Sequence, residues 1–174
     1  MSNVIFYTGS SSEPKVAKAI ERFEEMDRIE YLSSEELRPE AFKYIMFLES
    51  AGYGDWHIRR YYDPIINDID TDSCGYFIFD SVSDYVRRFI TFDDHRMTAV
   101  TYSAMIVENL QWLIDRIRKS DRTLILLSDD VGIVRPADKK ARLIESVIFQ
   151  VNMQIAQICD EVIVIEGGAS QQIK

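Results

Sequence analysis

Residues 4–16 read VIFYTGSSSEPKV, and this stretch sets the pattern for the rest of the chain. Residues 4–7 are apolar, β-branched and aromatic, which is typical of a strand. Small and polar residues at 8–12 then predict a turn. Pro14 suits the first turn of a helix, where its missing N–H costs little, and residues 16–25 continue with a helical pattern. The stretch therefore predicts a strand, a turn and a helix in that order.

Short apolar runs alternate with longer amphipathic segments along the remaining chain. We expect further strands at residues 29–32, 76–79, 123–127 and 162–165, and helices at 39–50, 82–90, 97–119 and 138–158. Residues 55–70 are ambiguous, with a helix favoured. Continuous apolar strands separated by helices are typical of a parallel sheet covered on both faces. The predicted fold class is α/β, with a mostly parallel sheet flanked by helices in three layers, and we expect residues 1–174 to form one domain.

Composition and charge restrict the classes of partner. The 174 residues carry 20 Lys and Arg against 29 Asp and Glu, a formal net charge of −9, which argues against binding nucleic acid or an anionic membrane surface. A local cluster of donors could still hold a small anion. The first residues lack a basic segment and a long apolar segment, so we expect a cytoplasmic protein. Cys74 and Cys159 lack the spacing of a zinc site and are expected to be reduced thiols.

The predicted topology gathers polar residues at one edge of the sheet. Right-handed crossovers place the carboxyl ends of all parallel strands on the same edge, where ligands of such sheets bind. The candidate site therefore collects residues 8–15, Asp80 and residues 128–132.

The first turn partly matches the phosphate loop G-x-x-x-x-G-K-[ST]. Gly9 and Lys15 have the required spacing, whereas Pro14 replaces the second glycine and Val16 replaces the hydroxyl residue that binds magnesium. In one interpretation the backbone N–H groups of residues 9–13 hold phosphate oxygens and Lys15 contacts the β- and γ-phosphates. In the other, this is a strand–turn–helix that carries a lysine and binds no phosphate.

Asp80 follows a second apolar strand and also has two interpretations. It could hold Mg²⁺, as the acid of a Walker B motif does. It could equally be an acidic residue at the start of the helix that follows Ser81.

The last third of the chain carries several short motifs in order. After the strand at 124–127 come Ser-Asp-Asp-Val-Gly-Ile-Val-Arg-Pro at 128–136, Val-Asn at 151–152, Asp-Glu-Val at 160–162 and Ile-Lys at 173–174. This series resembles the adenosylcobinamide kinase/adenosylcobinamide-phosphate guanylyltransferase family of cobalamin biosynthesis. That family has Asn-Glu-Val-Gly-x-Gly-Ile-Val-Pro after the strand, then Arg-Val-Asn-Gln, Asp-Glu-Val and Ile-Lys. The resemblance implies a P-loop NTPase-like domain and a homotrimer.

The resemblance also implies a set of site residues and a chemistry. It implies that GTP or ATP is used with Mg²⁺, first to phosphorylate the aminopropanol arm of the corrinoid and then to transfer a guanylyl group through a covalent histidine. The nucleotide contacts that it implies are Thr8, Gly9, Ser10, Ser11, Ser12, Lys15, Asp130 and Gly132, with Asp80 as the metal ligand. The sequence departs from the family loop Thr-Gly-Gly-x-x-Ser-Gly-Lys-Ser at Ser10, Pro14 and Val16.

The covalent histidine has no direct counterpart. Residues 40–50, where the family carries it, contain no histidine. His57, beside Trp56 and two arginines, is the only substitute that we consider, and the alternative is a surface histidine on an arginine-rich helix. His95 is expected to be a solvated residue near a helix start.

Two functions therefore stay open. The chain could be a divergent transferase in which Lys15, Asp80 and His57 act on nucleotide. It could instead be a non-catalytic member of the family that binds a nucleotide or a corrinoid, or acts as a partner subunit.

Overall fold

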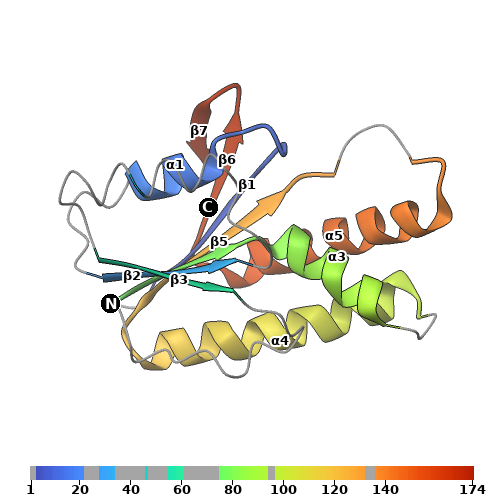
Figure 1. Cartoon of the computed structure of the whole chain (residues 1–174), viewed down its shortest axis with the longest axis horizontal. Coiled ribbons are helices and arrows are strands. Elements are labelled where there is room, and N and C mark those ends of the chain that lie inside the picture. The colour runs from blue at the N-terminus through green and yellow to red at the C-terminus, as the bar shows by residue number, and fades with distance from the viewer. Residues whose placement is uncertain are drawn as a thin grey trace.

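The computed structural model describes residues 3–21, 28–33, 46, 55–60, 75–93, 97–131 and 136–174, with the backbone alone at residues 28 and 55–60. Within these residues, seven strands form one sheet (Figure 1). The strands are β1 (Asn3–Gly9), β2 (Arg28–Ser33), β3 (Asp55–Arg60), β4 (Tyr76–Asp80), β5 (Thr123–Asp129), β6 (Glu161–Glu166) and β7 (Ala169–Gln172). Their order is β3-β2-β4-β5-β1-β6-β7, and every neighbouring pair is parallel except β6 and β7.

The described helices cover both faces of this sheet. They are α1 (Lys15–Glu21), α3 (Val82–Phe92), α4 (Ala99–Lys119) and α5 (Lys139–Ile158). In Figure 1, α1 lies on one side of the sheet, and α3, α4 and α5 lie on the other. The predicted three-layer α/β architecture with a mostly parallel sheet is therefore confirmed.

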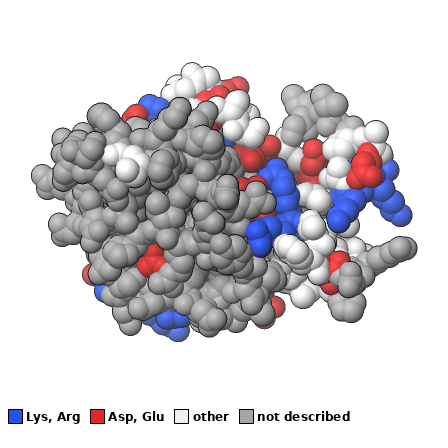
Figure 2. Space-filling model, in the orientation of Figure 1, with Lys and Arg blue, Asp and Glu red and all other residues white. Residues whose placement is uncertain are grey.

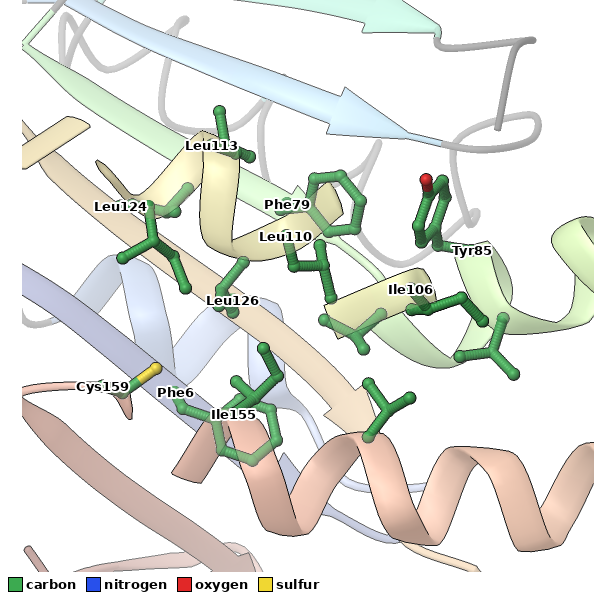
Figure 3. Close-up of a cluster of buried hydrophobic side chains, with 14 of the residues drawn as sticks. Phe6, Phe79, Tyr85, Ile106, Leu110, Leu113, Leu124, Leu126, Ile155 and Cys159 are labelled. Carbon is green, nitrogen blue, oxygen red and sulfur yellow. The ribbon is translucent and has the colours of Figure 1, made fainter. Parts of the chain in front are cut away.

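The two faces have separate hydrophobic cores because side chains alternate along each strand. Within β1, Val4 and Phe6 pack in the core under α3, α4 and α5, whereas Ile5 and Tyr7 pack in the core under α1. Figure 3 shows the larger core, in which Phe6 lies among side chains from the sheet and from α3, α4 and α5. Both faces of β1 are thus buried, which explains its continuous apolar sequence.

Side-chain oxygens mark where three of the helices begin. Ser81, Thr98 and Asp138 each stand at an N-cap, and their side chains accept hydrogen bonds from the backbone N–H groups of Asp84, Thr101 and Ala141. Such caps satisfy N–H groups that the helix itself leaves without an acceptor. The caps place the helix starts within two residues of the predicted ones.

Two strands differ from the sequence-based expectations. Residues 55–60, for which a helix was favoured, form β3. In the sequence, apolar Trp56 and Ile58 alternate with His57 and Arg59, a period of two that suits a strand paired with β2. The other is β7, whose exposed residues show no apolar pattern. It forms because Gly167 and Gly168, with φ of 58° and 77°, make the two-residue turn that a hairpin favours.

Other expectations fall outside the described part of the chain. These are the helix at 39–50, of which only the helical residue Met46 is described, and the end of the first helix after Glu21. Among the described residues, no helix has the length and apolar character needed to cross a membrane.

Gly9, the last residue of β1, packs against β6 with no room for a side chain. Its φ is 157°, and a Cβ built there would lie 2.5 Å from the backbone oxygen of Ile165. We therefore predict that Gly9→Ala lowers the free energy of unfolding by about 3 kcal/mol, measured by urea denaturation.

Gly75→Ala is the matched control, because a Cβ at Gly75 would meet no atom of the described residues within 4 Å. This control should change the free energy of unfolding by no more than about 1 kcal/mol. A Gly9→Ala variant as stable as the control would show that the junction of β1 and β6 tolerates a side chain.

Candidate functional site

The candidate site lies where β1, β4 and β5 reach their carboxyl ends. In the register of the sheet, Gly9 pairs with Asp129, and Asp80 pairs with Leu127. Residues 10–14 connect β1 to α1 at this edge, and α3 starts just after β4. The predicted gathering of residues 8–15, Asp80 and residues 128–131 at one edge is therefore observed, while Gly132 lies outside the described residues.

Lys15 is buried at the start of α1, with 3% of its surface exposed. Its Nζ lies 2.9 Å from Oδ1 of Asp129. It also donates to the backbone oxygen of Ser10 at 2.6 Å and points toward that of Gly9 at 3.4 Å. Three protein oxygens thus surround the ammonium group. An incoming phosphate has to replace at least one of them, since an ammonium group has only three donors.

Asp129 connects Lys15 to α3. Ser83 donates a hydrogen bond from its Oγ to Oδ2 of Asp129 at 3.3 Å, and the backbone N–H of Asp129 donates to the same Oγ at 3.3 Å. Nη1 of Arg87 lies 3.8 Å from Oδ2. One carboxylate, which is 7% exposed, therefore faces both Lys15 and Arg87.

Asp129 falls within the predicted range 128–132, but the family resemblance pointed to Asp130 instead. Strand alternation distinguishes these two acids. Ile125 and Leu127 pack in the core under α1, so alternation predicts that Asp129, two residues after Leu127, lies on the same face of the sheet, which also carries Lys15. The same alternation predicts that Asp130 lies on the opposite face. This signal was available in the sequence and would have identified Asp129.

Thr8 and Asp130 lie together toward α5. Oγ1 of Thr8 donates a hydrogen bond to Oδ1 of Asp130. Beside this pair is a groove of about 310 Å³, whose lining includes Phe149 and Met153 of α5. Asn152 fixes the nearby end of β5, since it accepts from Ser128 Oγ at 2.8 Å and donates to the backbone oxygen of Asp129 at 3.1 Å.

The loop between β1 and α1 uses part of its own hydrogen-bonding capacity. The backbone N–H of Glu13 donates to Ser10 at 3.1 Å, that of Lys15 donates to Glu13 at 2.8 Å, and Pro14 has no N–H. Among the described contacts, the backbone N–H groups of Ser11 and Ser12 have no protein acceptor. The loop can therefore offer fewer donors to a phosphate than a glycine-rich loop can.

Glu13 has a structural partner that the sequence did not predict. Its two carboxylate oxygens accept hydrogen bonds from the backbone N–H groups of Gly167 and Gly168, both at 2.9 Å. The negative charge of Glu13 is thereby held at the turn between β6 and β7. This contact also ties the loop to the end of the sheet opposite β3.

Asp80 is buried, at 5% exposure, and accepts a hydrogen bond from the hydroxyl of Tyr31. Its strand lies two positions from β1, about 10 Å at the usual spacing of neighbouring strands. The cap of α3 is Ser81 rather than Asp80, and the acid in the first turn of that helix is Asp84.

His57 lies far along the sheet from the loop. It belongs to β3, four strands from β1, a lateral distance of about 19 Å at the usual strand spacing. It pairs in register with Glu30 and stands three residues before the end of β3. Its side chain and the whole of His95 lie outside the described residues.

Cys159 is a poor candidate for a nucleophile. It is 1% exposed, and burial raises the pKa of its thiol to about 12, helped by the negative charge of Asp160. The reactive thiolate is therefore scarce near neutral pH. Cys74 lies outside the described residues.

The oxygen ligands at this edge fit a magnesium ion that arrives with phosphates. Asp80, Asp129 and Asp130 supply carboxylates, but the described residues contain no group of three or more side chains placed to hold a metal ion. Mg²⁺ commonly binds through one or two carboxylates together with water and substrate phosphates. A nucleotide-borne ion suits this donor set better than a site built by the protein alone.

Comparison with known proteins identifies a family. Residues 53–173 match the sequence model of the family described as cobinamide kinase / cobinamide phosphate guanyltransferase. The matched segment contains β3 to β7 with α3, α4 and α5, and begins after Lys15. No individually curated protein matches the chain. Because the family match covers more than half of the chain and agrees with its mostly parallel α/β sheet, the chain belongs to the cobinamide kinase / cobinamide phosphate guanyltransferase family.

Proposed function

We propose that this chain binds GTP or ATP by its phosphates at the carboxyl ends of β1 and β5 and transfers a phosphoryl group to adenosylcobinamide in cobalamin biosynthesis. The observation that carries the proposal is Lys15, which follows Gly9 at phosphate-loop spacing and begins α1 at this edge. Membership of a family of nucleotide-dependent transferases supports the same function.

Each residue of the site has a proposed role. Lys15 contacts the β- and γ-phosphates, and the backbone N–H groups of residues 9–12 hold phosphate oxygens. Asp80 holds Mg²⁺, which would neutralise charge on the phosphates. Thr8, Asp130 and Gly132 contribute further contacts to the nucleotide.

Phosphate binding at Lys15 exchanges a protein oxygen for a phosphate oxygen. The ammonium group gives up Asp129 or the backbone oxygen of Ser10 and gains a phosphate oxygen. The free energy of phosphate binding is the difference between the new contact with phosphate and the lost contact with the protein. It is therefore smaller than for a lysine that is solvated before the phosphate binds. We expect dissociation constants in the micromolar to millimolar range.

We propose further that guanylyl transfer through a covalent histidine does not occur in this chain. Residues 40–50 contain no histidine, and His57 belongs to a strand about 19 Å along the sheet from β1. A nucleophile has to come within hydrogen-bonding distance of the α-phosphate. The separation of these strands argues against His57 in that role.

The second candidate function is a non-catalytic member of the family that binds nucleotide or corrinoid, or acts as a partner subunit. The observation that favours it is the buried pair of Lys15 and Asp129, together with Pro14 and Val16 in a loop that loses one donor and one metal ligand. The nucleotide experiments below distinguish the two functions.

The resemblance to the family also leads us to propose a cytoplasmic homotrimer with a corrinoid as second substrate. Exposed apolar side chains support a surface that contacts either a subunit or a corrinoid. Phe149, Met153 and Ile173 are each more than half exposed, and all three line the groove beside Thr8.

Nucleotide binding predicts a rise in thermal stability. For a dissociation constant near 0.1 mM, GTP or ATP with Mg²⁺ at about 5 mM should stabilise the fold by about 2 kcal/mol and raise Tm by about 5 °C, measured by differential scanning fluorimetry. Lys15→Met should abolish the rise and lower the rate of phosphoryl transfer to adenosylcobinamide at least about 100-fold.

Lys18→Met is the control, because Lys18 lies on the same helix in an exposed pair with Glu21. It should leave the nucleotide-dependent rise in Tm unchanged. The absence of any rise with either nucleotide would refute the proposed binding. A rise without phosphoryl transfer would favour the non-catalytic function.

The proposed absence of a covalent step is tested by mass spectrometry of the intact protein after incubation with GTP and Mg²⁺. We expect no guanylylated protein, and we expect His57→Ala to keep the phosphoryl-transfer rate of the natural sequence within about twofold, a change below about 0.5 kcal/mol. His95→Ala is the control. An adduct that forms on the natural sequence and on His95→Ala, but not on His57→Ala, would contradict the proposal.

A further inference from the structure

Two cations converge on one carboxylate at the carboxyl end of β5. Lys15 Nζ lies 2.9 Å from Oδ1 of Asp129, and Arg87 Nη1 lies 3.8 Å from Oδ2 of the same side chain. These cations come from different helices, α1 and α3, on opposite faces of the sheet. One oxyanion, the carboxylate of Asp129, is therefore shared by cations from both faces.

Arg87 is more accessible than Lys15. Its side chain is 45% exposed, whereas that of Lys15 is 3% exposed. Arg87 also pairs with Asp84, three residues earlier on α3, at 2.8 Å. The guanidinium group has five N–H donors, so it can keep Asp84 and still bind another oxyanion. Figure 2 shows basic side chains beside acidic ones over the region where α3 and α5 lie in Figure 1.

The four described side chains of this cluster carry formal charges that balance. Lys15 and Arg87 contribute two positive charges, and Asp129 and Asp84 contribute two negative charges. Among the ion pairs of the described residues, Lys15 pairs with Asp129 at 2.9 Å, whereas Arg87 has its shorter contact with Asp84 and a longer one with Asp129. Arg87 can therefore turn toward a polyphosphate at a smaller cost than Lys15 can.

We infer that Arg87 is a second phosphate-binding residue, which holds the polyphosphate of a nucleoside triphosphate from α3 while Lys15 holds it from α1. This inference rests on the proposed nucleotide binding at the same edge. Arginine suits the role because its planar group binds phosphate oxygens in pairs. The polyphosphate would compete with the carboxylate of Asp129 for both cations.

The neighbouring Arg88 provides a matched control. It lies next in the sequence on α3, and its guanidinium carbon stands 5.4 Å from the ring centroid of Phe92. Arg88→Ala removes the same charge from the same helix without removing the contact with Asp129. A comparison of the nucleotide affinities of the two variants shows whether binding depends on the position of the cation or on the net charge of the protein.

Isothermal titration calorimetry with a non-hydrolysable GTP analogue and Mg²⁺ tests the inference. Arg87→Ala should raise Kd at least about 10-fold, as expected for the loss of a charged hydrogen bond. Arg87→Lys should have an intermediate effect, and Arg88→Ala should stay within about twofold of the natural sequence, a difference below about 0.5 kcal/mol. The double variant Asp84→Ala/Arg87→Ala keeps the net charge and should still bind at least about 10-fold more weakly.

The outcomes distinguish this inference from the proposed function. If Lys15→Met abolishes binding while Arg87→Ala and Arg88→Ala bind alike, Arg87 is not a phosphate ligand and the proposed function stands. If Asp84→Ala/Arg87→Ala regains normal affinity, net charge rather than the guanidinium group explains the effect, and the inference fails. If the natural sequence binds no nucleotide, both the proposed function and the inference are overturned. Urea unfolding of each variant checks that the fold is retained.

Discussion

The buried ion pair between Lys15 and Asp129 is the contact on which the arrangement of the site depends. It joins the first turn of α1 to the end of β5, and through Ser83 it extends to the first turn of α3. Both side chains are almost fully buried, so removal of one partner would leave a charge without compensation in a place that water barely reaches. The cost of such a change is typically about 3–5 kcal/mol. The pair therefore fixes the positions of two helices relative to the sheet edge.

The same pair determines how the proposed site would bind a ligand. The lysine that would hold phosphate is already occupied by a carboxylate, and its loop keeps few backbone donors for an anion. A polyphosphate has to compete with Asp129, and Arg87 offers a second and more accessible cation. On the face that carries α5, Thr8 and Asp130 also meet an apolar groove. The edge thus combines a charged cluster around Asp129 with an apolar groove beside α5.

Local sequence predicted the central strands, because a buried parallel strand is a continuous apolar run, and it placed the starts of α3, α4 and α5 within two residues. The helix favoured at residues 55–60 was wrong, although the period of two at Trp56 and Ile58 suits the strand that pairs with β2. β7 was missed because a glycine turn rather than its own residues forms it. At the site, Gly9 and Lys15 were found by spacing. Asp129 could have been found by strand alternation, because it lies two residues after Leu127 and therefore on the same face of the sheet. The contact of Glu13 with Gly167 joins residues 154 apart and left no signal in the sequence.

The most direct test of this account is a double-mutant cycle of unfolding free energies in urea for the natural sequence, Lys15→Met, Asp129→Asn and the double variant. Each single substitution should destabilise the protein by about 3 kcal/mol or more, because the remaining charge is buried without its partner. The double variant should lose less than the sum of the two, with a coupling of about 2 kcal/mol or more. Additive losses, with a coupling within about 0.5 kcal/mol of zero, would contradict a buried pair that holds the start of α1 to the sheet.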